Sequence, residues 1–293
     1  MYAVVCHDAG GAEIVSSYIR REGLDAVYSL EGPALGIFER KLGSVKSVSL
    51  EIAVNQASVV LCGTSWQSEI EVQAIEMARE KGKRTIAFLD HWVNYKERFE
   101  RGSRVYLPDE IWVGDAIAET MAKNAFPTVD VVVVENPYFK DLKQELLNIE
   151  ATAIGHDGLQ ILYVCEPVRE HALRQYGDQN YWGYTEEGAL RYFLSNIHLI
   201  VHNLKCILIR PHPSEPVEKY EWVHAEFDLP IRVFRGSTLL EQIVNSDIVA
   251  GCESMAMVVA MLADKRVIST IPPGGRDCIL PQQGIERFKD IVN

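Results

Sequence analysis

Short apolar runs recur along the sequence, and each is followed by small or polar residues. In the first half these runs are Tyr2–Cys6, Ala57–Cys62, Arg84–Leu89, Glu110–Val113 and Val129–Val134. Their apolar residues are continuous rather than alternating, which is typical of strands covered on both faces. The stretches between them have the length and pattern of amphipathic helices. Together these features predict a parallel sheet built from right-handed strand–helix–strand crossovers.

The pattern is interrupted near the middle of the chain and then starts again. Residues 138–150 are expected to form a polar helix, and the Gly-containing segment 151–158 has the composition of a linker. Further strands are expected at Leu159–Cys165, Lys205–Ile209, Ile231–Phe234, Ile248–Ala250 and Arg266–Thr270. The 293 residues are enough for two domains of ordinary size.

We therefore expect an α/β protein with two Rossmann-like, doubly wound domains, residues 1–150 and residues 151–293, that face a central cleft. A closing helix near residues 284–292 is expected to cross back to the first domain. In sheets of this kind ligands bind beyond the carboxyl ends of the strands. The residues that directly follow strands are therefore the candidates for function.

The overall charge narrows the possible partners. Lys and Arg total 29 against 41 Asp and Glu, a net charge of −12, which argues against a nucleic-acid partner. The six cysteines have no CxxC spacing and mostly lie in apolar runs, as free thiols do in a reducing compartment. The N-terminus is unlike a signal peptide, and no apolar run is long enough for a membrane span. These features predict a soluble, cytoplasmic protein.

Several well-known motifs are missing from the sequence. It contains neither a P-loop GxxxxGK[ST] nor an HExxH metalloprotease motif, and Gly10-Gly11 does not complete GxGxxG. The pairs His7-Asp8 and Asp90-His91 both follow strands and can in principle chelate a metal, but they have no ligand-spacing signature. We therefore predict no metal site and no cofactor.

Two groups of polar residues follow strands in the second half. In Arg210-Pro211-His212-Pro213 the prolines fix the backbone around a histidine beside an arginine. This arrangement suits a phosphate or a departing anion, although a rigid turn is the alternative. Glu253-Ser254 opens a helix whose first N–H groups attract anions, although Ser254 alone can be just an N-cap. Taken together, the two groups favour a phosphate site.

The first half offers candidates of a different kind. Asp90 follows a strand and is suited to act as a general base on a hydroxyl, with His91 beside it. The alternative is a turn or helix-capping residue. Gly10 and Gly11 open the first helix and allow a ligand to approach the backbone closely, or they form a tight turn for packing.

The order of these features resembles the GT-B glycosyltransferase architecture: a Gly-rich first loop, a central hinge, His-Pro after a strand, then a Ser-bearing helix and the DKRVIS strand. The His-Pro and downstream Ser are similar to motifs of bacterial sialyltransferases and capsule-polysaccharide transferases. At the motif level the resemblance covers residues 109–139 and 207–271. The sequence departs from it at Asp90-His91-Trp92, where those sialyltransferases have an acidic D/E-D/E-G motif. It departs again where Met255 follows Ser254 in place of a second serine.

The resemblance implies a metal-independent glycosyltransferase that moves a sugar from a nucleotide-activated donor, with a CMP-linked sugar as one candidate, to a surface polysaccharide or glycan. Asp90 would deprotonate the acceptor, and His212 would stabilise or protonate the leaving phosphate. The residues expected to bind substrate are Gly10, Gly11, His91, Arg210, Glu253 and Ser254. Because the chain is short for a two-domain transferase, we expect that it either lacks membrane-association elements or works with a partner. The candidate partners are a peripheral membrane component and a biosynthetic complex. The oligomeric state is left open.

Two other functions fit the same pattern. One is a nucleotide-sugar epimerase or hydrolase of the UDP-N-acetylglucosamine 2-epimerase type, which needs no acceptor. The other is a non-catalytic nucleotide-sugar-binding module. Turnover with donor alone distinguishes an epimerase or hydrolase from a transferase. A complete lack of turnover favours the non-catalytic binding module.

Overall fold

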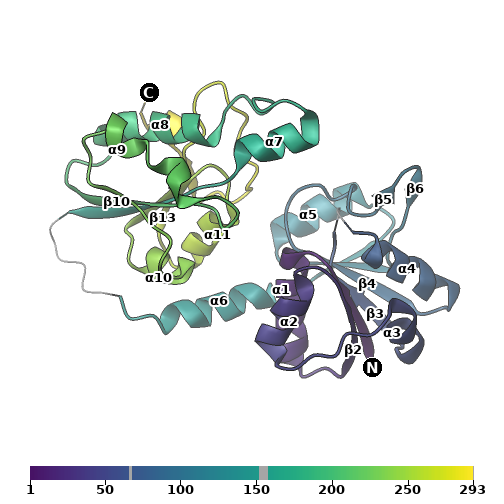
Figure 1. Cartoon of the computed structure of the whole chain (residues 1–293). Helices are drawn as coiled ribbons and strands as arrows, with labels where there is room; N and C mark the ends of the chain where they lie inside the picture. The colour runs from purple at the N-terminus through teal and green to yellow at the C-terminus, as the bar shows by residue number, and fades with distance from the viewer. Residues whose placement is uncertain (66–67, 152–157, 293) are drawn as a thin grey trace. The chain divides into compact units, whose positions relative to one another are not determined.

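The computed structural model describes residues 1–65, 68–151 and 158–292. Most of the expected linker, residues 152–157, lies outside this described part. The chain forms two compact units, Met1–Asp141 and Leu142–Asn293, each built around its own six-stranded parallel sheet (Figure 1). The expected α/β class with two Rossmann-like sheets is therefore confirmed.

In the first unit the strands lie in the order β2-β1-β3-β4-β7-β8, and every adjacent pair is parallel. The strands are β1 (Tyr2–Cys6), β2 (Ala26–Leu30), β3 (Val59–Cys62), β4 (Arg84–Leu89), β7 (Glu110–Val113) and β8 (Asp130–Val133). The helices are α1 (Ala9–Glu22), α2 (Ala34–Leu42), α3 (Leu50–Gln56), α4 (Ile70–Glu80) and α5 (Ala116–Ala125). The next helix, α6 (Pro137–Leu147), spans the boundary between the two units in the sequence. A two-stranded antiparallel ribbon, β5 (Glu100–Arg101) and β6 (Arg104–Val105), follows β4.

Both faces of the central strands of this sheet are covered, as their continuous apolar runs predict, whereas the edge strand β8 leaves Val132 and Val133 exposed. Val4 and Phe88 on one face pack in a cluster with residues of α1 and α2 such as Val15 and Phe38. Val5, which points to the opposite face, is equally inaccessible to solvent. Burial on both faces leaves polar side chains only at the strand ends, and this is where the candidate residues lie.

In the second unit the order is β11-β10-β9-β12-β13-β14, again fully parallel. The strands are β9 (Leu159–Val164), β10 (Leu204–Arg210), β11 (Ile231–Val233), β12 (Ile248–Gly251), β13 (Arg266–Ser269) and β14 (Ile285–Arg287). The helices are α7 (Val168–Tyr176), α8 (Glu186–Asn196), α9 (Val223–Glu226), α10 (Leu239–Val244), α11 (Met255–Leu262) and α12 (Phe288–Ile291), with 3₁₀ turns η1 (Ile197–Leu199) and η2 (Val217–Tyr220).

Each strand order contains one point where the chain reverses its direction across the sheet. In the first unit the chain goes from β1 to β2 on one side and then continues with β3 on the other. In the second unit β10 and β11 lie on one side of β9, and β12 to β14 lie on the other. Ligands of such sheets bind at these switch points, beyond the carboxyl ends of the strands. A ligand is therefore expected at the carboxyl ends of the two strand pairs β1/β3 and β9/β12.

The C-terminal segment differs from the expectation. Residues Ile285–Arg287 form β14, paired with β13, and only a single helical turn follows. Phe288 is fully buried in the core of the second unit, with its ring centroid 5.0 Å from that of Phe193. The expected closing helix that returns to the first domain is therefore corrected: an edge strand completes the second sheet, and Phe288 anchors the chain end there.

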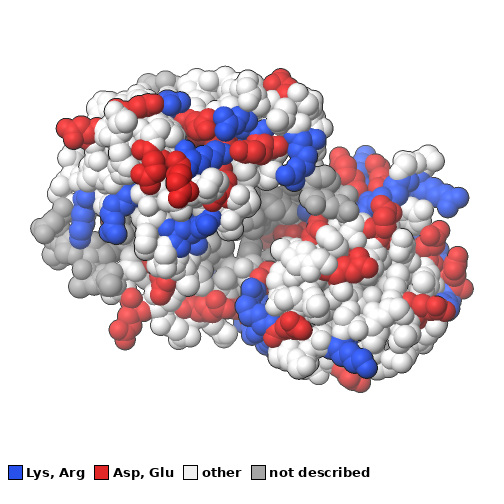
Figure 2. Space-filling model, viewed as in Figure 1, with Lys and Arg blue, Asp and Glu red and all other residues white. Residues whose placement is uncertain are grey.

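Among the described residues no helix is both long and apolar enough to cross a bilayer. On the face drawn in Figure 2, acidic and basic side chains are interspersed over both units.

Candidate functional site

Two glutamates lie at the β9/β12 switch point of the second unit. Glu166 lies two residues after the end of β9, and Glu253 lies two residues after the end of β12. The backbone N–H of Glu253 donates a hydrogen bond of 2.8 Å to Oε2 of Glu166. Burial raises the pKa of Glu166 to about 8, and the negative charge of Glu253 adds to the effect. Glu166 therefore carries a proton at neutral pH and is suited to donate it.

The loop that follows β13 adds a positive charge to this switch point. The Arg276 guanidinium forms an ion pair with Glu253 and lies 4.1 Å above the Trp182 ring. The backbone N–H of Arg276 donates to the Trp182 carbonyl at 2.9 Å. Tyr184 is 4% exposed, and its hydroxyl has no hydrogen-bond partner in the described structure. Carboxyl, guanidinium and phenol groups are thus gathered at one point.

Ser254 immediately precedes α11 and is its N-cap. Its hydroxyl accepts the backbone N–H of Ala256 at 3.3 Å. The capping role that the sequence left open is therefore present in the structure. A contact between Ser254 and a phosphate stays a prediction, because an N-cap hydroxyl can still donate its own hydrogen to a ligand.

His212 lies in the loop that follows the neighbouring strand β10. Its Nδ1 is 2.7 Å from Oγ of Ser214 and accepts the Ser214 backbone N–H at 3.2 Å. The backbone N–H of His212 donates to Oε2 of Glu215 at 3.1 Å, and the backbone carbonyl of His212 accepts from Nη1 of Arg235 at 2.8 Å. Burial lowers the pKa of His212, so the ring is neutral at pH 7.

Arg210, the last residue of β10, contacts residues in α10 and in the turn just before it. Its Nη1 donates to the Ser237 carbonyl at 2.9 Å and to Oε1 of Gln242 at 2.7 Å. These two bonds hold the guanidinium against its own domain. A substrate contact for Arg210 stays a prediction.

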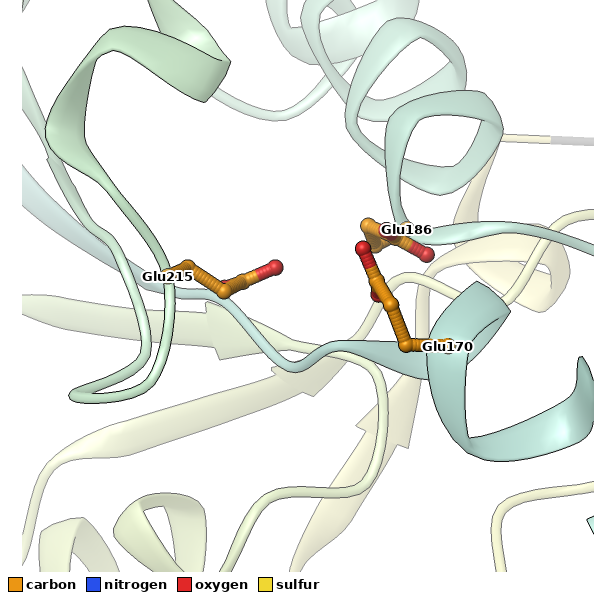
Figure 3. Close-up of side chains that lie close together, drawn as sticks. All are labelled: Glu170, Glu186 and Glu215. Atoms are coloured by element: carbon orange, nitrogen blue, oxygen red, sulfur yellow. The ribbon is translucent and has the colours of Figure 1, made fainter. Parts of the chain in front are cut away.

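Three carboxylates converge beside the His212 loop: Glu170, Glu186 and Glu215 (Figure 3). Lys219 Nζ lies 3.0, 2.5 and 2.7 Å from one oxygen of each, in that order. Its ammonium group therefore supplies the positive charge that three close carboxylates require.

Within the described ranges this is the one group of three such side chains whose ligand atoms come within 4.8 Å of one another. The residues His7, Asp8, Asp90 and His91, which the sequence allows as metal ligands, do not form such a group among the described residues. The Glu170–Glu186–Glu215 cluster has a structural task instead, because Glu215 also accepts the N–H of His212.

In the first unit Asp90 follows β4 and is held by a buried arginine. Arg98 pairs with Oδ1 of Asp90 and donates to the carbonyl and Oγ1 of Thr64 at 3.2 and 2.7 Å. A Cβ atom at Gly10 would lie 1.8 Å from Oδ2 of Asp90. The structure therefore brings together Gly10 and Asp90, which the sequence analysis selected separately, and it adds Arg98, which that analysis missed.

Gly11 and His91 have local partners that explain their positions. A Cβ atom at Gly11 would lie 3.0 Å from Cα of Gly63, so the glycine permits close packing of α1 on the end of β3. Nδ1 of His91 accepts the Trp92 N–H at 2.9 Å. Burial lowers the pKa of His91 against the opposite effect of the Asp90 carboxylate.

The β1/β3 switch point holds three residues that were not assigned a catalytic role. Nδ1 of His7 lies 2.7 Å from Oδ1 of Asp8, and the His7 N–H donates to Oε1 of Glu71 at 2.9 Å. Glu71 is 3% exposed, and burial raises its pKa to about 7. No sequence pattern marks Glu71, because it comes from α4 and meets His7 only in the folded chain.

Comparison with known proteins adds the fold relationship. No protein-family model and no curated protein matches this sequence. A structure described as a UDP-N-acetylglucosamine 2-epimerase from Listeria monocytogenes aligns with a TM-score of 0.58 and 11% identity, over 91% of this chain and 78% of that one. At this identity the similarity concerns the fold alone, which is a pair of Rossmann-like units of the GT-B kind.

Two further solved structures align at lower scores. MurG from Acinetobacter baumannii gives a TM-score of 0.48 and 12% identity, over 92% of this chain and 76% of that one. A variant of the wall teichoic acid polymerase TagF gives 0.49 and 12%, over 92% and 69%.

The contact between Gly10 and Asp90 leads to a stability prediction. Gly10→Ala places a methyl group where the Asp90 carboxylate lies, so that carboxylate must leave Arg98. We expect a loss of about 1–3 kcal/mol in the free energy of unfolding, measured by urea denaturation. The matched control is Gly36→Ala in α2, where a Cβ atom meets nothing within 4 Å and a gain of about 0.4–1 kcal/mol is expected. Equal stability of the two variants would contradict this account of Asp90.

The proton on Glu166 leads to a pH prediction. The folded protein holds this proton to about pH 8, whereas the unfolded chain releases it near the ordinary carboxyl value of 4.5. The folded state therefore binds more protons between these values, and the contribution of Glu166 to stability falls as pH rises from about 5 to about 8.

Glu166→Gln keeps an oxygen for the Glu253 N–H and removes the titration. Its melting temperature relative to the parent protein should rise between pH 5 and pH 9, which thermal denaturation measures. Glu218→Gln, at an exposed position of the same unit, should give a constant difference. A pH-independent difference for Glu166→Gln would show that Glu166 does not hold the proton.

Proposed function

We propose that this chain is a glycosyltransferase that takes a sugar from a nucleotide-activated donor bound by the second unit. The observation that supports it most strongly is the polar cluster at the β9/β12 switch point. There Glu166, Glu253 and Arg276 lie at the start of α11, where Rossmann-order sheets bind phosphate-bearing ligands.

On the donor side, the groups of the second unit receive the departing nucleotide. The first N–H groups of α11 and the guanidinium of Arg276 attract the phosphate charge. The neutral ring of His212 donates a hydrogen bond to the phosphate oxygen that takes the electron pair of the broken C–O bond. Donors arranged in advance in this way stabilise the transition state more than the ground state. No step of this mechanism requires a metal.

On the acceptor side, the first unit supplies the base. Asp90 is the proposed residue, with Oδ1 fixed by Arg98 and the carboxylate lying against the start of α1. It takes the proton of the acceptor hydroxyl as the hydroxyl oxygen bonds to the anomeric carbon. His7 is a second candidate for this step, because Asp8 lies at Nδ1 and leaves Nε2 for the proton.

The identities of donor and acceptor rest on the sequence resemblance to sialyltransferases and capsule-polysaccharide transferases. It favours a CMP-linked donor and a surface-polysaccharide or glycan acceptor. Transfer of a sugar to such an acceptor fits a cytoplasmic protein that contacts a membrane surface or a biosynthetic complex. Gly10, Gly11, His91, Arg210 and Ser254 are proposed to contact these substrates.

A second function, nucleotide-sugar epimerase or hydrolase, is favoured by two observations. The fold is similar to that of the structure described as a UDP-N-acetylglucosamine 2-epimerase. Glu166 is also a proton-carrying carboxyl group on the donor side, and proton transfer to the sugar or its leaving group needs such a residue.

The two functions are separated by incubating the protein with CMP- and UDP-linked sugars, with and without oligosaccharide acceptors, and analysing the products. A transferase forms a new glycosidic bond and turns over slowly with donor alone. Epimerised sugar or rapid release of free nucleotide without acceptor would favour the second function. No turnover with any donor would favour a binding module.

Two substitutions test the assigned roles in the same assay. We expect Asp90→Asn to lower transfer by about 10²–10⁴-fold and His212→Gln by about 10²–10³-fold. Asp130→Asn, at an exposed position on β8, is the control and should leave transfer unchanged. If His7→Gln abolishes transfer and Asp90→Asn does not, the base is His7 and the assignment of Asp90 is wrong.

A further inference from the structure

The loop around His212 restricts the chemistry of its imidazole ring. Nδ1 accepts the backbone N–H of Ser214 at 3.2 Å and lies 2.7 Å from Oγ of the same residue. A backbone N–H can only donate, so Nδ1 must present its lone pair to it. In a neutral ring the proton is then on Nε2.

The backbone of the loop that carries the ring is held from several directions. Glu215 accepts the backbone N–H of His212, and Arg235 donates to the carbonyls of His212 and Glu215 at 2.8 and 3.1 Å. Glu215 is itself held by Lys219 at 2.7 Å and by the Tyr220 hydroxyl at 3.0 Å. These contacts keep the backbone of His212 and Ser214 in place, and the two contacts at Nδ1 orient the ring toward Ser214.

The charged and titratable groups around the ring act in both directions. Glu215, in the same loop, favours the imidazolium, while His171 of α7 and Arg235 beyond β11 oppose it. Burial also opposes it and is the largest effect on the pKa of His212. A proton added at Nδ1 would face the hydrogen of the Ser214 N–H. The loop geometry therefore disfavours the imidazolium, as burial does.

We propose that Ser214 is a positioning residue that fixes His212 as a neutral Nε2–H donor, so that His212 binds a phosphate oxygen through a hydrogen bond and transfers no proton. This inference rests on the proposed function for the identity of the ligand, although the state of the ring does not depend on it. The contacts that the structure describes for the ring are at Nδ1, which leaves Nε2 for the ligand.

The reaction then has a definite proton balance. The bond between the anomeric carbon and the phosphate oxygen breaks, and its electron pair goes to that oxygen. Nε2–H of His212 donates a hydrogen bond to this oxygen and keeps its proton. The acceptor oxygen forms the new bond to the anomeric carbon, and its proton goes to the base of the first unit. The nucleotide therefore leaves as an anion, without protonation by His212.

The test is nitrogen NMR of the full-length protein labelled with ¹⁵N-histidine at pH 7. The sequence contains eight histidines, so the His212 signals are assigned by their loss in His212→Gln. We expect an unprotonated Nδ1 and a protonated Nε2. A protonated Nδ1, either in the other tautomer or in a charged ring, would overturn the proposal.

Two variants at position 214 isolate the backbone contact. Ser214→Ala keeps the N–H and should retain the Nε2–H form. Ser214→Pro removes the N–H, and its spectrum should contain a substantial Nδ1–H population; an unchanged tautomer would exclude a positioning role for Ser214. Circular dichroism shows whether Ser214→Pro folds. If it does not, the histidine NMR spectra of the parent protein and of Ser214→Ala are the test of the His212 tautomer.

Titration with CMP and UMP tests the role of the fixed ring. A nucleotide that binds should shift the Nε2–H signal of His212 and leave Nδ1 unprotonated. Binding that leaves this signal unmoved would overturn the contact with His212 but not the nucleotide site. Failure of every nucleotide to bind would overturn the proposed function and with it the phosphate ligand of His212, while the parent spectrum still reports the tautomer.

Discussion

The structure depends on one constraint: the central strands of both sheets are buried on both faces, so polar side chains are accommodated only where strands end. Val4 and Val5 of β1 show this directly, since neighbouring residues that point to opposite faces are both inaccessible to solvent. Because all strands of a sheet are parallel, their carboxyl ends lie at one edge. The candidate residues that follow the strands of each unit therefore lie at that edge, as do the switch points.

At these edges the side chains hold one another in defined protonation states and positions. Glu166 keeps a proton because burial raises its pKa, whereas the Ser214 N–H holds His212 neutral with its proton on Nε2. Asp90 lies where it does because Gly10 has no side chain and because Arg98 holds one of its oxygens. The chemistry that we propose follows from these arrangements rather than from any single residue.

Much of the fold could be predicted from the sequence, because continuous apolar runs mark doubly covered strands. The strands Arg84–Leu89 and Glu110–Val113 have the expected bounds. The weakly apolar β2, with the sequence AVYSL, and the polar α7 were missed, because their stability comes from packing on neighbours rather than from their own pattern. The closing segment was misread for the same reason: residues 285–287 join β13 as an edge strand.

The candidate site was predicted only in part. Strand ends can be located in a sequence, and Asp90, His212 and Glu253 were selected as candidates in this way. The partners that define their chemistry come from distant segments: Arg98 lies beyond Asp90 in a loop, and Arg276 reaches Glu253 from the loop after β13. Glu71 meets His7 from 64 residues away, a contact that no local pattern encodes.

The most direct test of the central claim, that the edge of the second unit binds a nucleotide phosphate, is calorimetric titration of the full chain with CMP, UMP and UDP. We predict that at least one of them binds and that Arg276→Met weakens its binding by about tenfold or more, which corresponds to about 1.4 kcal/mol. Glu218→Gln should bind as the parent protein does. If none of the three nucleotides binds, or if Arg276→Met binds as tightly as the parent, the claim is wrong.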